Sequence, residues 1–296
     1  MSEGPAVSVV VASHGRPLRL RWLLNALEEQ TLREPWEAIV VHDYDAPTAR
    51  RILEAHALCA AGTLRAIAIE PGTGSPSRQR NIGWRAASGE LVAFTDDDCR
   101  PEPEWLERLL AVARCAPGRI VQGRVRAEPH EAAILAAPHV RTLWIDPVGR
   151  YAQTANILYP RALLERLGGF DERAIAGEDV GLSLRARRAG VAIEGATEAI
   201  VNHAVESHTL PGIVRQNWKW RHLAYLVRRH PEFRRQMPLG LFWDAEHLRT
   251  TAALAGLLGA RRHPALLALA APYAVRALGR RGPQPRRRAL ALAELP

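Results

Sequence analysis

The strongest constraint on the fold is a repeated alternation of short β-branched runs with segments of helical periodicity. Val7–Val11 is an apolar run, and Leu18–Gln30 after it carries leucines at the spacing of one helical face. Further strands are predicted at Ala38–Val41, Leu64–Ile69, Leu91–Thr95 and Ile120–Ala127, and further helices at Thr48–Ala60, Arg80–Ala87, Trp105–Arg114, Arg161–Leu167 and Val180–Ala189. This alternation predicts an α/β fold, with a mostly parallel sheet covered by helices.

Size and composition fit one such domain with an extension. The chain has 296 residues, 47% of them hydrophobic and 24% charged, which excludes a disordered chain. Strand patterns end near residue 205, so we expect an α/β domain over residues 1–205 and a helical extension over residues 206–296. The three cysteines form no CxxC pair, which excludes a disulfide framework and a zinc ribbon. A short polar segment precedes the first strand, so we expect no signal peptide and a cytoplasmic location.

The net charge of +9 is concentrated in the extension. Residues 1–210 carry 24 basic and 27 acidic side chains, a net charge of −3, whereas residues 211–296 carry 16 basic and 4 acidic, a net charge of +12. Tryptophans lie among these cations, a combination typical of helices that bind an anionic membrane surface. The apolar segments Thr250–Gly259 and Ala265–Leu278 are separated by Arg261–Pro264, so neither reaches the roughly 20 residues of a spanning helix.

The extension is therefore expected to dock peripherally on an anionic membrane, on the inner face of the cell membrane. The arginines at its end that would supply charge are Arg276, Arg280, Arg281, Arg286, Arg287 and Arg288. The alternative is a tail that packs on the α/β domain or on a second subunit, as in a homodimer. Nucleic acid is not expected as a partner, because no recognition motif accompanies the charge.

Polar residues cluster where three predicted strands end, at Ser13–Arg16, His42–Asp45 and Asp96–Asp98. Ligands of open α/β sheets bind at the carboxyl ends of strands, so we expect these clusters to lie at one edge. The three consecutive carboxylates repel one another unless a cation or solvent compensates them. A hard divalent cation would do so and would also bind substrate phosphates. The alternative is a solvated turn that caps the next helix.

Four segments, in order and over about residues 6–205, resemble the motifs of family-two GT-A glycosyltransferases. They are Val7–Pro17, similar to "vSVvi-x-[ST]-yNRp"; Arg80–Asp98, similar to "aRN-x-G … a-x-Ge … f-x-DxD"; Gly168–Glu172, similar to "GGFDE"; and Gly177–Arg185, similar to "EDxdLxxR". The resemblance implies a GT-A fold. It also implies an inverting enzyme that moves a sugar from a metal-bound nucleoside diphosphate sugar to an acceptor hydroxyl.

The resemblance implies a nucleotide site at the ends of the first strands. Asp43 corresponds to the family acid that accepts the imino proton of the base, and Ala12 and Ser13 would contact the nucleotide through their backbone. The remaining nucleotide-binding residues implied are Arg16, Arg80, Asp96 and Asp97, with Arg80 facing the diphosphate. His42 replaces the first acid of the family's "vvDDgS" motif, and Tyr44-Asp45-Ala46 departs from its end. A surface loop is the alternative for His42 and Tyr44.

The resemblance also assigns the metal and the base. Asp98 and Asp96 would hold the divalent cation, with His203 as an additional ligand; imidazole beside oxygen ligands favours Mn²⁺ over Mg²⁺. Displacement of a nucleoside diphosphate needs a base for the acceptor hydroxyl, which the resemblance places at Asp179, with Glu178 as the other candidate. A single base implies inversion. The alternative for both acids is an ordinary acidic first turn of a helix.

Two other classes of protein remain open at this point. A sugar nucleotidylyltransferase also uses strand-end acids and a metal, although a lysine-bearing glycine loop near the N-terminus is absent and Lys219 is the only lysine. A non-catalytic protein that binds carbohydrate or acts as a membrane scaffold is the other alternative. The acceptor of a transferase would be a saccharide, a lipid-linked molecule or a peptide, as in polysaccharide biosynthesis. The sequence does not separate these acceptors.

Overall fold

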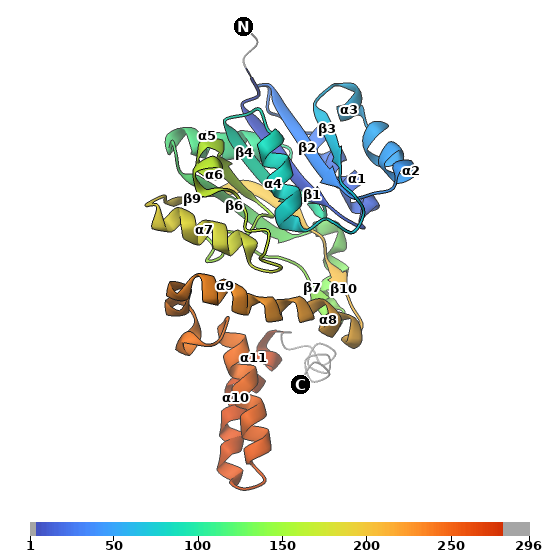
Figure 1. Ribbon diagram of the computed structural model, residues 1–296. Coiled ribbons are helices and arrows are strands. Elements are labelled where there is room, and N and C mark those ends of the chain that lie inside the picture. Colours follow the sequence, from blue (N-terminus) through green and yellow to red (C-terminus); the bar gives the residue numbers. More distant parts are fainter. Residues whose placement is uncertain (1–3, 281–296) are drawn as a thin grey trace. The chain divides into compact units, whose positions relative to one another are not determined.

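The protein is represented by a computed structural model that describes residues 4–280 (Figure 1). These residues form two compact units. The first consists of the residues up to Ala132 together with Thr142–Val205 and Lys219–Leu226, and the second of Ala133–Arg141, Glu206–Trp218 and the residues from Val227 on. The domain boundary near residue 205 stays a prediction.

The first unit is built on an eight-stranded sheet with the order β3-β2-β1-β4-β8-β6-β9-β5. The strands are β1 (Val7–Ser13), β2 (Trp36–His42), β3 (Leu64–Ala68), β4 (Leu91–Asp96), β5 (Cys99–Pro101), β6 (Ile120–Ala127), β8 (Ile157–Pro160) and β9 (Ile193–His203). Neighbours among β3, β2, β1 and β4 are parallel, as are β6 and β9, whereas β8 and β5 run antiparallel to their neighbours. The predicted α/β class is confirmed.

Helices cover both faces of this sheet. They are α1 (Pro17–Glu28), α2 (Ala46–Ala49), α3 (Ala57–Ala60), α4 (Pro76–Ala86), α5 (Trp105–Cys115), α6 (Arg161–Leu167) and α7 (Glu178–Arg188). The single helix predicted for Thr48–Ala60 is wrong, because a π-helical turn at Arg50–Glu54 (η1) separates α2 from α3. The chain becomes extended at His56, whose side chain accepts a hydrogen bond from the Leu58 N–H and so starts a new helix.

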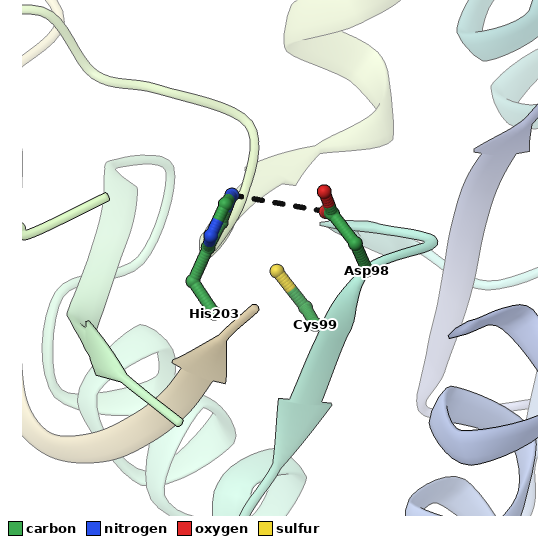
Figure 2. A group of neighbouring side chains, drawn as sticks. All are labelled: Asp98, Cys99 and His203. Carbon is green, nitrogen blue, oxygen red and sulfur yellow. Dashed lines mark ion pairs between the residues drawn. The ribbon is translucent and has the colours of Figure 1, made fainter. Parts of the chain in front are cut away.

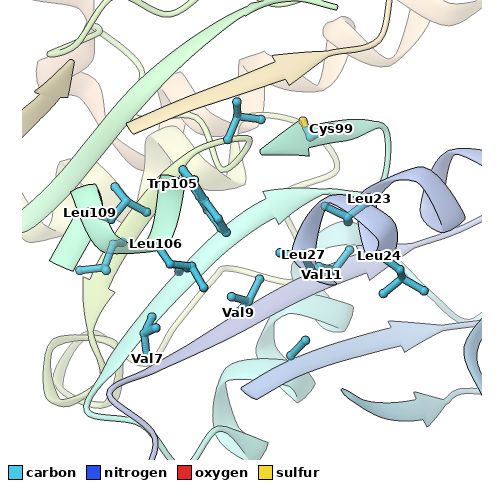
Figure 3. Close-up of a cluster of buried hydrophobic side chains, with 14 of the residues drawn as sticks. Val7, Val9, Val11, Leu23, Leu24, Leu27, Cys99, Trp105, Leu106 and Leu109 are labelled. Atoms are coloured by element: carbon cyan, nitrogen blue, oxygen red, sulfur yellow. The ribbon is translucent and has the colours of Figure 1, made fainter. Parts of the chain in front are cut away.

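The alternation of side chains along β1 divides the core into two layers. Val7, Val9 and Val11 point to one face, where fully buried leucines of α1 and residues of α5 cover them (Figure 3). Val10 points to the other face and joins the cluster that includes Trp84 of α4 and residues of α6 and α7. This period-two pattern fixes the register of β1, so the end of the strand presents Ser13 at a defined position.

The C-terminal region is helical. Its helices are α8 (Leu210–Asn217), α9 (Leu223–Arg229), α10 (Ala245–Gly259) and α11 (Ala271–Arg280), with short 3₁₀ segments η3 (Trp218–His222), η4 (Pro231–Gln236), η5 (Pro238–Gly240) and η6 (Pro264–Ala270). A further 3₁₀ segment, η2 (Pro129–Ala136), follows β6. A two-stranded ribbon of β7 (Val140–Arg141) and β10 (Glu206–Ser207) belongs to the second unit. Within residues 4–280 no helix has the length and apolar character needed to cross a membrane. The predicted charge cluster at Arg281 and Arg286–Arg288 lies outside the described residues.

The turn after α6 offers a matched test of the packing. Gly168 and Gly169 both adopt left-handed backbone angles, with φ of 75° and 71°. A Cβ at Gly168 would meet nothing within 4 Å, whereas one at Gly169 would lie 2.4 Å from Oδ1 of Asn81. We expect Gly168→Ala to cost about 1–2 kcal/mol from backbone strain alone.

Gly169→Ala should cost about 1–3 kcal/mol more, because the added methyl group must displace Asn81 and the Trp84 indole. Urea unfolding of both variants measures the difference. Equal losses of stability in the two variants would show that Asn81 does not pack against Gly169 as described.

Candidate active site

The three predicted polar clusters meet at one edge of the sheet. Because β1 lies parallel to β2 and β4, Ala12 stands in register with Val41 on one side and with Asp96 on the other. The Ser13 hydroxyl donates a hydrogen bond to Asp97 Oδ2 at 2.8 Å. His14 Nδ1 lies 2.6 Å from Asp43 Oδ2. The candidate nucleotide-binding residues of β1, β2 and β4 therefore form one continuous group.

A buried glutamine stabilises this edge. Gln79 Nε2 donates hydrogen bonds to the Ser13 carbonyl at 3.0 Å and to the Val41 carbonyl at 3.3 Å, so it joins the ends of β1 and β2. His42 is only 2% exposed and stacks on Tyr44, which is half-buried. Burial lowers the pKa of His42 and so favours its neutral form. His42 is thus packed at the end of β2, whereas Tyr44 lies in the following loop with its hydroxyl 2.8 Å from the Ser13 hydroxyl.

Two arginines compensate the three strand-end carboxylates. Arg16 contacts Asp98 and lies 3.1 Å from Asp97 Oδ1. Burial raises the pKa of Asp97 to about 7, although the Arg16 charge acts in the opposite direction. Arg80 binds Asp96 Oδ1 at 2.8 Å. Repulsion among the acids therefore does not by itself require a metal ion, since the chain supplies its own counter-charges.

Arg80 also connects the strand-end acids to α7. Its guanidinium donates to Asp96 Oδ1 and to Glu178 Oε1, both at 2.8 Å, and the residue is only 6% exposed. Burial opposes the ionised form of Asp96, yet the Arg80 charge outweighs it and lowers the pKa of this carboxyl. These contacts tie Arg80 to protein acids, and its predicted role at the diphosphate stays a prediction.

Asp179 lies beside this pair at the start of α7. Gly177, in a left-handed conformation with φ of 77°, precedes the helix, and Asp179 Oδ1 accepts a hydrogen bond from the Val180 N–H at 2.7 Å. Burial and the adjacent Glu178 charge raise the pKa of Asp179 to about 7, although Arg80 opposes them. A carboxyl group with such a pKa can exchange a proton near neutral pH.

A second cluster joins Asp98 to His203 across β5 and β9 (Figure 2). His203 Nε2 lies 3.7 Å from Asp98 Oδ1. His203 Nδ1 lies 2.8 Å from the Ala204 carbonyl, which accepts its proton and leaves Nε2 as the basic nitrogen. Asp98, Cys99 and His203 each offer a ligand atom, and these atoms lie within 4.8 Å of one another. The cluster therefore has the composition of a small metal site.

Asp98 and His203 fit a hard divalent cation better than Cys99 does. Carboxylate oxygen and imidazole nitrogen suit Mn²⁺ or Mg²⁺, whereas a thiolate suits softer metals. Burial and the nearby Asp98 charge raise the pKa of Cys99, which keeps the thiol protonated. Asp96 is not a member of the cluster, and its place among the ligands stays a prediction. The sequence analysis did not identify Cys99 as a member of this cluster. Cys99 is placed there by the pairing of β5 with β9, in which it lies opposite His203.

Asn81 of the second motif and Arg185 of the fourth join the elements around the site. Asn81 Nδ2 donates to the Phe170 carbonyl at 2.9 Å and to Glu172 Oε1 at 2.8 Å. Arg185 donates to the Leu167 and Gly169 carbonyls at the end of α6. These bonds join α4 and α7 to the turn that leads into Glu178 and Asp179. Sequence reasoning gave no role to either side chain.

A mostly parallel sheet with acids at its strand ends and a histidine on a late strand is the arrangement expected of a GT-A fold. Residues 8–160 match the family model described as "Glycosyl transferase family 2". This match spans more than half of the chain, so the chain belongs to that family. The recognition made from the four motifs is confirmed.

The chain is similar to several curated transferases. It is 30% identical over 173 residues to a pre-mycofactocin glycosyltransferase of Mycobacterium tuberculosis, a match that covers 55% of this chain but only 37% of the relative. It is 26% identical over 205 residues to the glycosyltransferase AglE of Haloferax volcanii, with 67% of each chain covered. The chain thus spans little more than a third of the mycobacterial relative's length.

Solved structures share the fold. Staphylococcus aureus TarS 1-349 in complex with UDP matches with a TM-score of 0.55 and 19% identity, covering 97% of this chain and 88% of TarS 1-349. The mannosyltransferase PcManGT of Pyrobaculum calidifontis, in complex with GDP-Man and Mn²⁺, matches with a TM-score of 0.54 and 21% identity, covering 99% and 80%. The predicted GT-A fold is confirmed.

Proposed function

We propose that the chain is an inverting glycosyltransferase that moves a sugar from a nucleoside diphosphate donor to an acceptor hydroxyl. The observation that carries this proposal is the Arg80 bridge, which holds Asp96 of the strand-end acids and Glu178 of α7 at 2.8 Å each. Because of this bridge, a proton-accepting carboxyl group lies beside the edge where an open α/β sheet binds its ligand. Glycosyl transfer requires a base for the acceptor hydroxyl close to the site that binds the sugar donor.

The nucleotide would bind at the ends of β1 and β2. Asp43 would accept the imino proton of the base, and the backbone of Ala12 and Ser13 would contact the nucleotide. Asp98 and His203 would hold a divalent cation, and such a cation, when bound, neutralises charge on the departing diphosphate. PcManGT, which shares this fold, was solved with Mn²⁺ and GDP-Man. Arg16 would change partner from the acids to the donor phosphates.

Asp179 is the better candidate for the base. Glu178 is bound by Arg80, which keeps its carboxylate engaged in an ion pair. Asp179, with its pKa raised to about 7, is basic enough to take a proton from an acceptor hydroxyl and ionised in a large fraction near neutral pH. One base and no second carboxylate in the role of nucleophile imply a single displacement, which inverts the anomeric centre. Glu178 would then fix the geometry of α7 through Arg80.

A binding screen of nucleotide sugars tests the donor assignment. Uracil, thymine and guanine each present an imino proton to Asp43, whereas adenine and cytosine do not. We expect UDP-, dTDP- or GDP-sugars to bind in the presence of Mn²⁺, with ADP- and CDP-sugars about tenfold weaker or more, the cost of one unpaired carboxylate. Asp43→Asn should reduce this preference, while Asp45→Asn, a change in the same loop, serves as the matched control. Equal binding of all five bases would exclude the proposed role of Asp43.

We further propose that the C-terminal unit docks on an anionic membrane surface, so that the acceptor is lipid-linked. Leu210 and Val214 of α8 and Trp218 at its C-terminal cap lie four residues apart and are 59%, 58% and 65% exposed, which gives this segment an apolar stripe. Leu257 and Leu258 of α10 are 49% and 76% exposed. Such faces beside clustered cations suit an anionic bilayer interface.

Sedimentation with vesicles measures this docking. We expect the full chain to sediment with phosphatidylglycerol vesicles at low salt and to be released at high salt, since each cation near the surface contributes about 1 kcal/mol. Val214→Asp should weaken sedimentation, whereas Leu18→Asp, at a site on α1 that is 69% exposed, should not. If the full chain stays in the supernatant at low salt, the tail is a packing or dimerisation element.

A further inference from the structure

A pocket of about 430 Å³ in the first unit is lined by residues of α1, of β5 and of the segment that follows β6. Trp22 and Asn25 of α1 and Glu29 at its C-terminal cap line the pocket, together with Arg100, Glu128 and His130. Its volume falls within the about 300–1,000 Å³ range of small-molecule sites. The residues that carry the proposed transfer do not line it.

Glu128 gives the pocket a buried hydrogen-bond acceptor. The residue is 3% exposed, and its Oε1 accepts hydrogen bonds from Arg100 Nη1 and from the His130 N–H, both at 3.2 Å. Its Oε2 is also buried and has no hydrogen-bond partner among residues 4–280. A buried carboxylate oxygen without a donor is costly, so a rotation of the Glu128 side chain that brought this atom to a ligand hydroxyl in the pocket would be favoured.

Trp22 gives the pocket an aromatic surface. It is 44% exposed although it lies in a helix whose other large apolar residues are mostly buried. The Arg19 guanidinium lies over the indole, 4.9 Å from the ring centroid, and Arg19 is paired with Glu131. These contacts keep the indole in one orientation, which lowers the entropic cost of packing a ligand against it.

The charges of the lining favour neither an anion nor a cation strongly. Glu29, Glu128 and Glu131 line the pocket with one arginine, Arg100, so the lining offers an anion no excess of positive charge. Glu128 is paired with Arg100, and Glu131 is paired with Arg19, so two of the three carboxylates are already neutralised against a cation. The remaining chemistry is an aromatic surface with a dense set of neutral and ion-paired hydrogen-bonding groups, which favours a neutral polyhydroxylated ligand.

We propose that this pocket is a saccharide-binding site, separate from the donor site, in which a sugar ring packs on Trp22 and donates a hydroxyl hydrogen bond to Glu128. The site adjoins the candidate metal cluster, because the Glu128 N–H donates to the His203 carbonyl at 2.8 Å. A saccharide held here would therefore lie near the transfer edge without occupying it. Occupancy needs neither a nucleotide nor a metal.

The test measures binding of neutral disaccharides to the full chain without nucleotide or metal. Maltose, cellobiose, lactose and N,N′-diacetylchitobiose serve as probes, followed by saturation-transfer NMR and tryptophan fluorescence. We expect at least one of them to bind. Trp22→Ala should weaken this binding about tenfold, the loss of one aromatic contact. Trp144→Ala is the matched control, because Trp144 is 62% exposed, belongs to the same unit and does not line the pocket.

Trp22→Ala removes a partly exposed side chain, and an unchanged unfolding curve would show that the variant folds. Glu128→Gln should also weaken binding about tenfold while leaving nucleotide binding unchanged. The proposal is overturned if none of the four disaccharides binds, or if Trp144→Ala weakens binding as much as Trp22→Ala. Displacement of the disaccharide by UDP or GDP with Mn²⁺ would also overturn it. Disaccharide binding is measured without a nucleotide sugar donor. Failure of the saccharide-site proposal would therefore leave the transferase proposal untouched.

Discussion

Asp179→Asn is expected to lower the turnover of glycosyl transfer about a hundredfold or more while leaving donor affinity within a few-fold. The change keeps the shape of the side chain but removes the proton acceptor, and loss of a general base typically costs about 10²–10⁴-fold. Donor affinity should persist because the proposed nucleotide contacts lie on β1 and β2. Transfer kinetics and calorimetric donor binding on the same preparation measure both quantities. An equal loss of donor binding would make Asp179 a structural residue.

The pH dependence gives a second readout of the same group. Burial and the Glu178 charge raise the pKa of Asp179 to about 7, and the base must be ionised to accept a proton. The rate should therefore rise with pH below about 7 and level off above it. Asp179→Asn should lose this limb of the profile, whereas Glu178→Gln should keep it, with a lower midpoint because a negative neighbour is gone. A profile that survives Asp179→Asn unchanged assigns the base elsewhere.

Asp98→Ala is expected to abolish the dependence of nucleoside diphosphate binding on a divalent cation. Wild-type binding of the diphosphate should be strong with Mn²⁺ and weak with excess chelator, because Asp98 and His203 present an oxygen and a nitrogen 3.7 Å apart. His203→Ala should lose a large part of the same effect. In Asp98→Ala the affinity measured with Mn²⁺ should fall to that measured with chelator, and in His203→Ala it should fall most of the way to that value.

Cys99→Ala is the matched control for this experiment. The Cys99 thiol lies in the same cluster but is fully buried and held protonated, so its removal should leave the Mn²⁺ dependence intact. If Cys99→Ala abolishes the dependence and His203→Ala does not, the site is a sulfur-containing one of another kind. Tight diphosphate binding by the wild type in excess chelator would exclude a metal-dependent donor site.

The central parallel strands β1, β2 and β4 could be predicted from sequence because each contains a run of four apolar residues. The observed bounds of β6 and α6 are those predicted. The antiparallel strands were missed, since β5 and β8 have only three and four residues and pair with strands distant in sequence. Local periodicity carries no information on such pairings. It also failed at Arg50–Glu54, where a π-helical turn interrupts a helical pattern.

The location of the site could be predicted for a physical reason, because parallel strands end at one edge and bring Ser13, Asp43 and Asp97 together. The ion pairs of the site could not be predicted from the sequence. The pairing of Arg16 with Asp97 and Asp98 joins residues more than eighty positions apart, and Arg80 joins acids from β4 and α7. From sequence the three acids predicted a metal, whereas in the structure Arg16 and Arg80 pair with them. A metal site at Asp98 and His203 stays a prediction.

Release of nucleoside diphosphate from a panel of nucleotide sugars, followed by NMR with Mn²⁺ and compared between the wild type and Asp179→Asn, tests the central claim most directly. We expect the wild type to consume at least one UDP-, dTDP- or GDP-sugar, slowly with water and faster with a saccharide or lipid-linked acceptor, and Asp179→Asn to be about a hundredfold slower. If the folded wild type neither binds nor consumes any sugar of the panel with Mn²⁺ or Mg²⁺, the chain is not the transferase described.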